Sequence, residues 1–431
     1  KIIAIAETLG VKYDELVSLK LSKKHEPISD LLQSPIFKEF PLEMFGLEPA
    51  KLIDLIANAP VKMNAFIGTI IEIARNYEMR KESFYFAALR SYQELHDNYF
   101  EDLEDAVDDF LQEHKIRYKP PFDRKYLYDT LETEYGYTID KEQLQANRKL
   151  LQFRSVFIPK SRKLLINDGL SESQKNFLLA REIAFNYLNL QERPNTTPPY
   201  KVRSFEEVLN NFKASYFAVA LLMNKKHVIN DLQALFQHTT WSTSRLHKII
   251  NKYSASPEMF LHRLSCLLPT FYGIKSLFFL RFEYSGKTKL FNLTKELHLS
   301  KLHNPHGNEL NEHYCRRWIS FTLIEALKRR QKKTPSTKPI SGIQRSKYWE
   351  TNNEYLCLTL AKPNTPSPNS HISVTIGFLV DESLKKKIHF INDKRIPVKW
   401  VNETCERCAI ADCKERAAEP DVIKSKERED Q

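Results

Sequence analysis

Three of the six cysteines lie close together near the end of the chain, at a spacing that suits a metal site. Cys405 and Cys408 form a C-x-x-C motif, which places two thiolates on one turn, and Cys413 follows after four intervening residues. A site with four thiolate ligands needs one more cysteine. Cys315 is our candidate for this fourth ligand, because its neighbours in the sequence include Arg316 and Arg317 and no apolar stripe.

The two remaining cysteines lie in apolar segments, and we expect Cys266 and Cys357 in the core. Four thiolates suit either a tetrahedral Zn²⁺ ion or an iron–sulfur cluster. Structural zinc sites usually have two C-x₂₋₄-C pairs, whereas one distant cysteine with three clustered ones is the layout of regulatory [4Fe–4S] proteins. We therefore predict a [4Fe–4S] cluster, with zinc as the alternative. Three free cysteines on a surface turn are the remaining interpretation, although such thiols oxidise readily.

A second constellation lies on a helix expected from about 173 to 190, which contains the run F-L-L-A-R-E-I-A-F. This run resembles the F-x-L-A-H-E-x-x-H helix of ImmA/IrrE-type zinc peptidases, in which two histidines bind Zn²⁺ and the glutamate is the general base. Glu182 remains, but Arg181 and Phe185 stand at the histidine positions and Lys213 stands where an acidic third ligand is expected. Cations repel a dication and phenylalanine has no donor atom, so we expect a degenerate site, with no catalytic residue and no enzymatic activity.

The cysteine tail also carries the strongest resemblance of the chain. Residues 405–420 read C-x-x-C-x₄-C-x-x-R-A followed by proline, which resembles the end of the short-chain fatty-acyl transcriptional regulators. Further landmarks of that family occur in order at 98–103, 256–264, 278–286 and 315–318. The resemblance implies a DNA-binding regulator that senses a short-chain acyl-CoA and controls fatty-acid, propionate or glyoxylate metabolism.

The resemblance also points to residues that would lie near the effector. Arg281 and Lys289 are the basic residues that we expect there, because coenzyme A carries phosphates. The chain departs from the family pattern nearby, with Glu283 in place of aspartate, Lys287 in place of asparagine and 316–317 in place of Pro-Leu.

Composition excludes several classes of protein. The 10 glycines stand alone, so the chain contains neither G-x-G-x-x-G nor G-x-x-x-x-G-K-S/T, the usual dinucleotide and P-loop cradles. The net charge of +11 suits DNA and the phosphates of coenzyme A. No apolar run approaches the ~18 residues that a membrane span needs, and no signal peptide is visible. We expect a cytoplasmic protein without a membrane partner.

The segments that must position these residues predict an α+β fold. Strands are expected at 137–139, 155–158, 163–167, 276–282, 355–360 and 372–378, and helices at 173–190, 205–223 and within 242–268. Ser171 and Gln174 form a capping box at the start of the first of these helices. The basic run 328–336 is predicted to be an exposed loop, with a phosphate or nucleic-acid contact as the alternative. The acidic run 101–109 is predicted to be a solvated helix face.

Five segments follow from these patterns. Residues 1–22 resemble the last helices of a Cro/repressor-type helix-turn-helix domain, whose recognition helix we expect before Lys1, so DNA binding would depend on that preceding segment. The other four are a helical linker at 23–115, a zincin-like ImmA/IrrE-type pseudo-peptidase domain at 116–245, a mixed α/β effector domain with the cysteine site at 246–420, and a disordered tail at 421–431.

Two other functions stay open at this stage. A zinc endopeptidase is one, if the degenerate site still held metal. A non-catalytic interaction protein that dimerises through its acidic helical linker is the other. For the regulator, we expect a homodimer that binds DNA and acyl-CoA.

Overall fold

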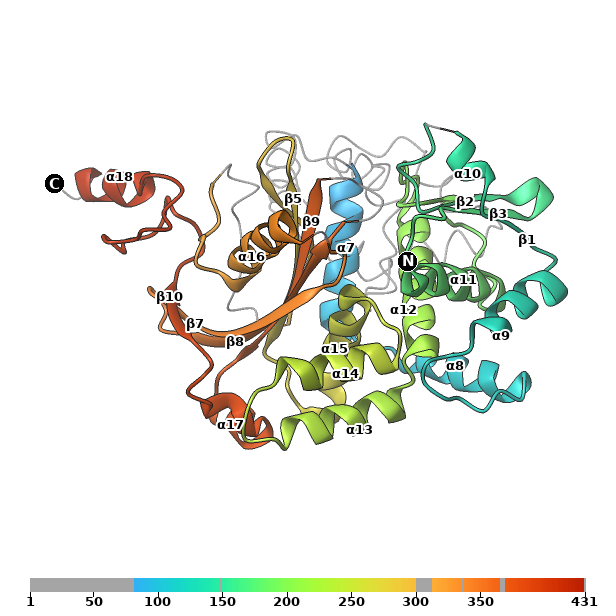
Figure 1. Ribbon diagram of the computed structural model, residues 1–431, viewed down its shortest axis with the longest axis horizontal. Helices are drawn as coiled ribbons and strands as arrows, with labels where there is room; N and C mark the ends of the chain where they lie inside the picture. Colours follow the sequence, from blue (N-terminus) through green and yellow to red (C-terminus); the bar gives the residue numbers. More distant parts are fainter. Residues whose placement is uncertain (1–80, 148, 300–311, 335, 365–368, 430–431) are drawn as a thin grey trace, which may run out of the picture. The chain divides into compact units, whose positions relative to one another are not determined.

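The computed structural model describes residues 81–147, 149–299, 312–334, 336–364 and 369–429 (Figure 1). The chain forms two compact units, Lys1–Tyr92 with Lys201–Leu209, and Gln93–Tyr200 with Asn210–Gln431. The expectations for 1–22 and for most of the linker lie outside the described residues. Within the described part, no helix is long and apolar enough to cross a membrane.

The helices fall into three stretches of the chain. The first stretch has α7 (Lys81–Leu95), α8 (Glu101–Glu113), α9 (Arg124–Asp129), α10 (Gln143–Ala146) and α11 (Glu172–Tyr187). The second has α12 (Phe205–Leu222), α13 (Lys225–Phe236), α14 (Thr243–Lys252) and α15 (Pro257–Tyr272). The third has α16 (Ile319–Lys333), α17 (Glu382–Lys387) and α18 (Asp421–Glu429). A π-helical turn at Thr130–Glu134 and 3-10 turns at Pro159–Ser161 and His389–Asn392 complete the set.

A small four-stranded sheet precedes α12 in the chain. Its strands are β1 (Thr138–Asp140), β2 (Ser155–Ile158), β3 (Lys163–Ile166) and β4 (Thr196–Thr197), in the order β1-β3-β2-β4. β1 pairs with β3 in parallel, and the other pairs are antiparallel. The predicted capping box is present at the start of α11, where the backbone N–H of Ser171 donates to Gln174 Oε1 at 3.0 Å.

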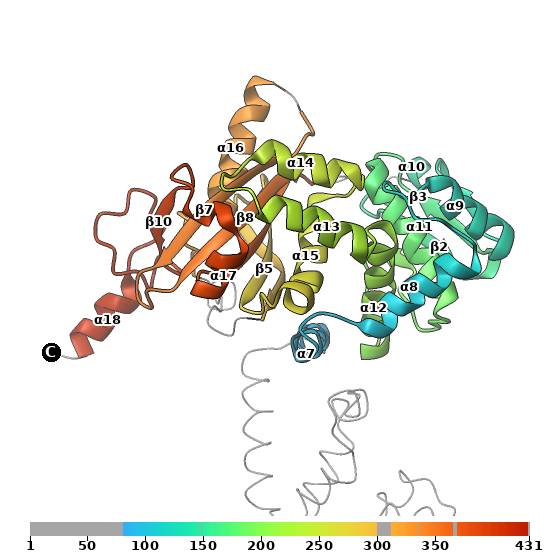
Figure 2. The ribbon, with the colours of Figure 1, turned by 90° about the horizontal axis from the view of Figure 1, so that it is seen from below.

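A larger sheet of six strands forms the C-terminal part. It contains β5 (Leu277–Ser285), β6 (Phe291–His298), β7 (Ile340–Tyr348), β8 (Glu354–Pro363), β9 (Ser370–Leu379) and β10 (Val398–Val401). The order is β10-β7-β8-β9-β5-β6, antiparallel except for the parallel β10–β7 pair. α16 packs against β7, β8 and β9, and α15 packs against β5 and β9. Helices α13, α14 and α15 lie between the two sheets (Figure 1, Figure 2).

The α+β fold class is confirmed, and the six predicted strands are all present. Alternation along β5 explains its position: Phe278, Leu280 and Phe282 are buried in one cluster with Trp318 and Phe321. The intervening residues point to the opposite face of the sheet, because successive strand residues alternate. One face of β5 is therefore aromatic, and the other carries the charged residues Arg281 and Glu283.

Two local expectations were wrong. The basic run 328–336 is not a loop at its start, because α16 continues to Lys333. Buried Ile324 and Leu327 give that helix its apolar stripe, and basic residues in a last turn offset the helix dipole. The tail at 421–431 contains α18, where we expected disorder.

The acidic helix α8 differs from the prediction at one position. Leu103, Val107 and Phe110 are buried as expected, but Glu104 is buried with them, at 2% exposure. Arg263 of α15 forms a bidentate pair with Glu104, in which Nη2 lies 2.9 Å from Oε2. The sequence could not reveal this partner, which lies 159 residues away. The predicted domain limit at 245 falls inside α14.

Candidate functional site

The strongest candidate site lies around Glu182 on α11, which is 1% exposed. Arg193, in the segment before β4, places Nη2 2.5 Å from Glu182 Oε2. The Tyr137 hydroxyl donates to the same Glu182 oxygen at 3.3 Å. The Arg193 guanidinium and the Tyr137 hydroxyl therefore already occupy one oxygen of this carboxylate.

Aromatic rings enclose the Arg193 guanidinium. Its Cζ atom lies 3.8 Å from the centroid of the Phe185 ring and 4.4 Å from that of Phe157. Phe157 in turn stacks on Tyr137, with ring centroids 5.1 Å apart. The Phe185 position therefore presents an aromatic face to a cation, where a zinc peptidase would present an imidazole nitrogen.

Arg181, at the other histidine position, is 3% exposed and lies on the second side of Glu182. Its Nη2 atom is 3.8 Å from Glu182 Oε1, and it also donates to Thr197 Oγ1 of β4. Burial lowers the pKa of Arg181 to about 10. The positive charge of Arg193 also lowers this pKa, whereas the carboxylate of Glu182 raises it. Two guanidinium groups thus flank one carboxylate. Such a set has one excess positive charge and would repel a dication.

Lys213 is half-buried on α12. The ion pairs of Glu182 within the described residues are with Arg181 and Arg193, and Lys213 is in neither of them. Arg193 is the residue that sequence reasoning missed. It follows α11 in a loop without periodicity, and its only signal was a basic residue next to Pro194.

The cysteines come from two segments that the structure brings together. A bridge joins Tyr314 and Thr404 in antiparallel fashion, with Cys315 N donating to Glu403 O at 2.9 Å and Cys405 N donating to His313 O at 2.8 Å. Cys315 and Cys405 follow the bridged residues on each segment, so both point to the same side of the bridge. Cys315 is buried in an apolar cluster, which corrects our expectation of polar surroundings.

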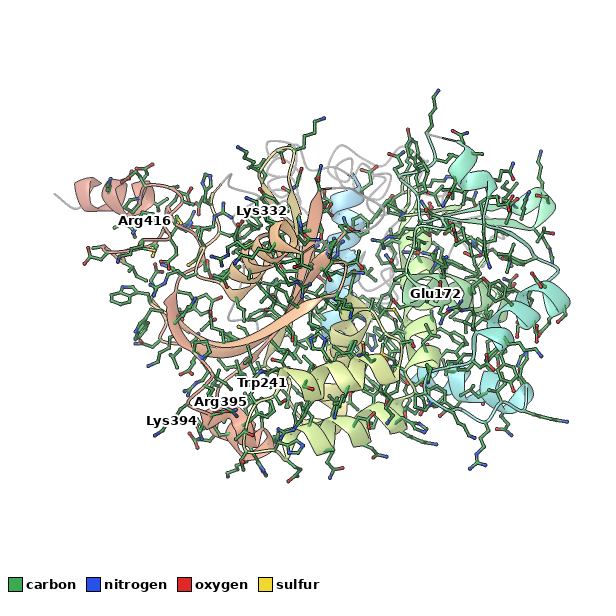
Figure 3. All side chains as sticks on the ribbon, viewed as in Figure 1. Glu172, Trp241, Lys332, Lys394, Arg395 and Arg416 are labelled. Atoms are coloured by element: carbon green, nitrogen blue, oxygen red, sulfur yellow. The ribbon has the colours of Figure 1, made fainter. Side chains whose placement is uncertain are left out.

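The C-x-x-C turn and Cys413 are held by the following segment. Arg416, labelled in Figure 3, donates from Nη1 to the carbonyl of Cys405 at 3.0 Å and from Nη2 to that of Cys408 at 3.2 Å. The backbone N–H of Ala417 donates to Cys405 Sγ at 3.3 Å. Cys408 is buried, and Cys413 is half-buried.

The donor chemistry of the four cysteines fits a tetrahedral thiophilic metal. In the described part of the chain, however, no three side chains of His, Cys, Asp or Glu converge as a metal-binding group. Burial raises the pKa of Cys315 to about 11, and the neighbouring Cys405 and Cys408 add to that shift. The thiols are therefore close enough to influence one another electrostatically. Cys266 and Cys357 are buried in the core as predicted.

The two predicted effector residues lie apart. Arg281 is 6% exposed on β5 and pairs with Glu258 of α15, with Nε 3.2 Å from Oε2. Lys289 is exposed in the turn between β5 and β6, with a positive φ of 59°. Four strand residues separate Arg281 from the end of β5 at Ser285, which is roughly 13 Å of strand.

Residues 133–265 match the model of the IrrE N-terminal-like domain of the Peptidase_M78 family. This range holds β1, β2, β3, α11 and the Glu182 site, and it extends through α14 into α15.

A solved structure of a Mycobacterium tuberculosis transcriptional regulator has a similar fold, with a TM-score of 0.53 at 14% sequence identity. The alignment covers 76% of this chain and 92% of that chain. At this identity the likeness concerns the fold, which extends beyond the IrrE-like domain to most of the chain. Among curated proteins, no sequence matches significantly.

Proposed function

We propose that the protein is a DNA-binding transcription regulator in which the IrrE-like domain has a regulatory role and no peptidase activity. The observation that carries this proposal is the pairing of Glu182 with Arg193, at 2.5 Å. In a zinc peptidase the corresponding glutamate must be free to accept a proton from metal-bound water. Here the guanidinium of Arg193, whose side chain is 11% exposed, already pairs with it. The fold shared with a transcriptional regulator supports the regulatory role.

The effector in this proposal is a short-chain acyl-CoA, and the pathway that responds is fatty-acid, propionate or glyoxylate metabolism. The net charge of +11 supports anionic partners of both kinds, DNA and coenzyme A. Dimerisation, which would present two DNA-binding units to a two-fold symmetric operator, and a cytoplasmic location belong to the same proposal.

The proposal also includes a metal centre held by Cys405, Cys408 and Cys413, with Cys315 as the fourth ligand. The adjacency of the Cys315 and Cys405 segments supports this set, and so does the N–H donor at Cys405 Sγ. Four thiolates would hold a [4Fe–4S] cluster or, as the alternative, zinc. When bound, such a centre would fix the tail to the six-stranded sheet, because metal binding stabilises the fold that presents its ligands.

Three measurements test the proposal. Chromatin immunoprecipitation of the tagged protein in its own host should recover a limited set of promoters, and acyl-CoA titration should give saturable binding. Protease assays with added zinc should show no cleavage above that of Glu182→Gln. Zinc-dependent cleavage lost in Glu182→Gln would instead establish the peptidase alternative. Absence of both promoter and acyl-CoA binding would favour a pure interaction protein.

A further inference from the structure

The face of the six-stranded sheet that α15 covers carries a row of charged side chains. Strand register places Lys295 of β6 directly opposite Arg281 of β5. It also places Glu283 of β5, Ile372 of β9 and Lys362 of β8 in one line across the sheet. Directly opposed residues share a face. The row therefore lies on one side, opposite the aromatic cluster.

Two carboxylates, one on α15 and one in this row, already have cationic partners. Glu258, in the first turn of α15, lies 3.2 Å from Arg281 Nε and 2.5 Å from Lys295 Nζ. Glu283 lies 3.6 Å from Arg281 Nη1 and accepts from Asn364 and Ser370, both at 2.9 Å. Both acids are thus paired with Arg281 or Lys295.

Two further cations reach the same group of charges. Arg154, immediately before β2, and Lys362, on β8, are both half-buried. Within the described residues, neither side chain has a hydrogen-bond or ion-pair partner. Burial lowers the pKa of Lys362 to about 8, and the charges of Glu258, Arg154 and Arg281 act on it. Burial also lowers the pKa of Arg154, on which Glu258 and Arg281 act as well.

The charge balance of this cluster is positive. Four cations, Arg154, Arg281, Lys295 and Lys362, face two carboxylates, Glu258 and Glu283. Two positive charges remain without a counter-ion among the described residues. Partly burying such charges is costly, and a bound anion is the simplest way to recover that cost.

We propose that Arg154 and Lys362 bind a phosphate group of an anionic ligand, next to the paired Arg281. A guanidinium fork and an ammonium point charge together suit the tetrahedral oxygens of phosphate, and two free charges match its dianion. This inference rests on the proposed function only in taking coenzyme A as the source of the phosphate. Free inorganic phosphate carries the same chemistry.

Isothermal titration of the whole chain with inorganic phosphate, and separately with propionyl-CoA, tests this site. Arg154→Gln and Lys362→Met should each weaken binding by about tenfold or more, the loss expected for a charge-assisted contact. Lys362→Arg should retain most of the affinity. Lys332→Met is the matched control, because Lys332 is an exposed lysine on α16, away from α15 (Figure 3). Circular dichroism verifies that each variant is folded, and Lys362→Arg and Arg154→Gln carry the test if Lys362→Met is not.

The possible outcomes test the phosphate site and the proposed acyl-CoA effector separately. Phosphate binding that depends on Arg154 and Lys362, without propionyl-CoA binding, supports the site and refutes the proposed effector. Propionyl-CoA binding that is unaffected in Arg154→Gln and Lys362→Met overturns the site while leaving the effector intact. Binding of neither ligand by the folded protein also overturns the site.

Discussion

The Nη2 atom of Arg193 lies 2.5 Å from the Oε2 atom of Glu182, while the same guanidinium stacks on Phe185 at 3.8 Å from the ring centroid. One side chain thus neutralises the glutamate and covers the position of a zinc ligand. The site therefore differs from that of a zinc peptidase in more than the two histidine positions. The site has been rebuilt around an internal cation.

This arrangement predicts that restoring the motif alone does not restore zinc binding. Arg181→His with Phe185→His recreates H-E-x-x-H on α11, but Arg193 still occupies the centre. We expect the double variant to bind less than about one tenth of an equivalent of zinc per chain, because the Arg193 guanidinium repels the ion. Adding Arg193→Ala should raise it severalfold, as measured by mass spectrometry of dialysed protein. A full equivalent of zinc in the double variant would contradict this interpretation.

The buried pair of Arg263 and Glu104 predicts a large effect on stability. Arg263→Met leaves Glu104 without its cation, and Tyr216, whose hydroxyl donates to Glu104 at 2.9 Å, cannot replace it. We expect a loss of about 3–5 kcal/mol in the free energy of unfolding, measured by urea denaturation. Lys275→Met removes the exposed pair with Asp97 and should cost less than about 1 kcal/mol. Equal effects of the two substitutions would be inconsistent with this reasoning.

The shifted pKa of Lys362 predicts that phosphate binding depends on pH. Its value of about 8 lies below that of an ordinary lysine, so the ammonium loses its proton as the pH rises through that value. The monoester phosphate of coenzyme A keeps its dianionic charge above about pH 7, because the second pKa of a phosphate monoester is about 6, so propionyl-CoA is the ligand for this measurement. Affinity should therefore fall from about pH 7 to about pH 9, by roughly tenfold. Lys362→Arg should remove most of this dependence, and an unchanged profile in that variant would assign the titration elsewhere.

The proposed cysteine ligands predict that serine substitutions at the six cysteines have two different effects on metal content. Serine at Cys315, Cys405, Cys408 or Cys413 should lower the metal content of anaerobically purified protein and its melting temperature. Serine at Cys266 or Cys357, which are buried in the core, should leave the metal content unchanged. An absorption band near the visible range distinguishes a [4Fe–4S] cluster from colourless zinc. Full metal occupancy in Cys408→Ser would refute the site.

The local sequence pattern predicted the helices and strands better than it predicted which side chains meet in the folded protein. The apolar run 277–280 and the Ser171 capping box each placed an element correctly, because both signals lie within one segment. Arg193 was invisible, because an irregular loop brings it to Glu182. Arg154 and Lys362 lie more than two hundred residues apart in the sequence, and the register of β8, β9 and β5 defines the face that Lys362 occupies. The hydrophobic periodicity of a single segment cannot predict that two side chains so far apart in the sequence lie near the same group of charges.

The pairing of Arg263 with Glu104 bears on how this protein can be divided. The match to the IrrE N-terminal-like domain ends at 265 and starts at 133, so it includes Arg263 and excludes Glu104. A fragment cut at those limits would contain a guanidinium that is 1% exposed in the whole chain and that has lost its counter-ion. Recombinant fragments should therefore become soluble only when they begin before α8. We therefore expect the smallest stable fragment that contains Arg263 to be larger than the domain that sequence comparison recognises.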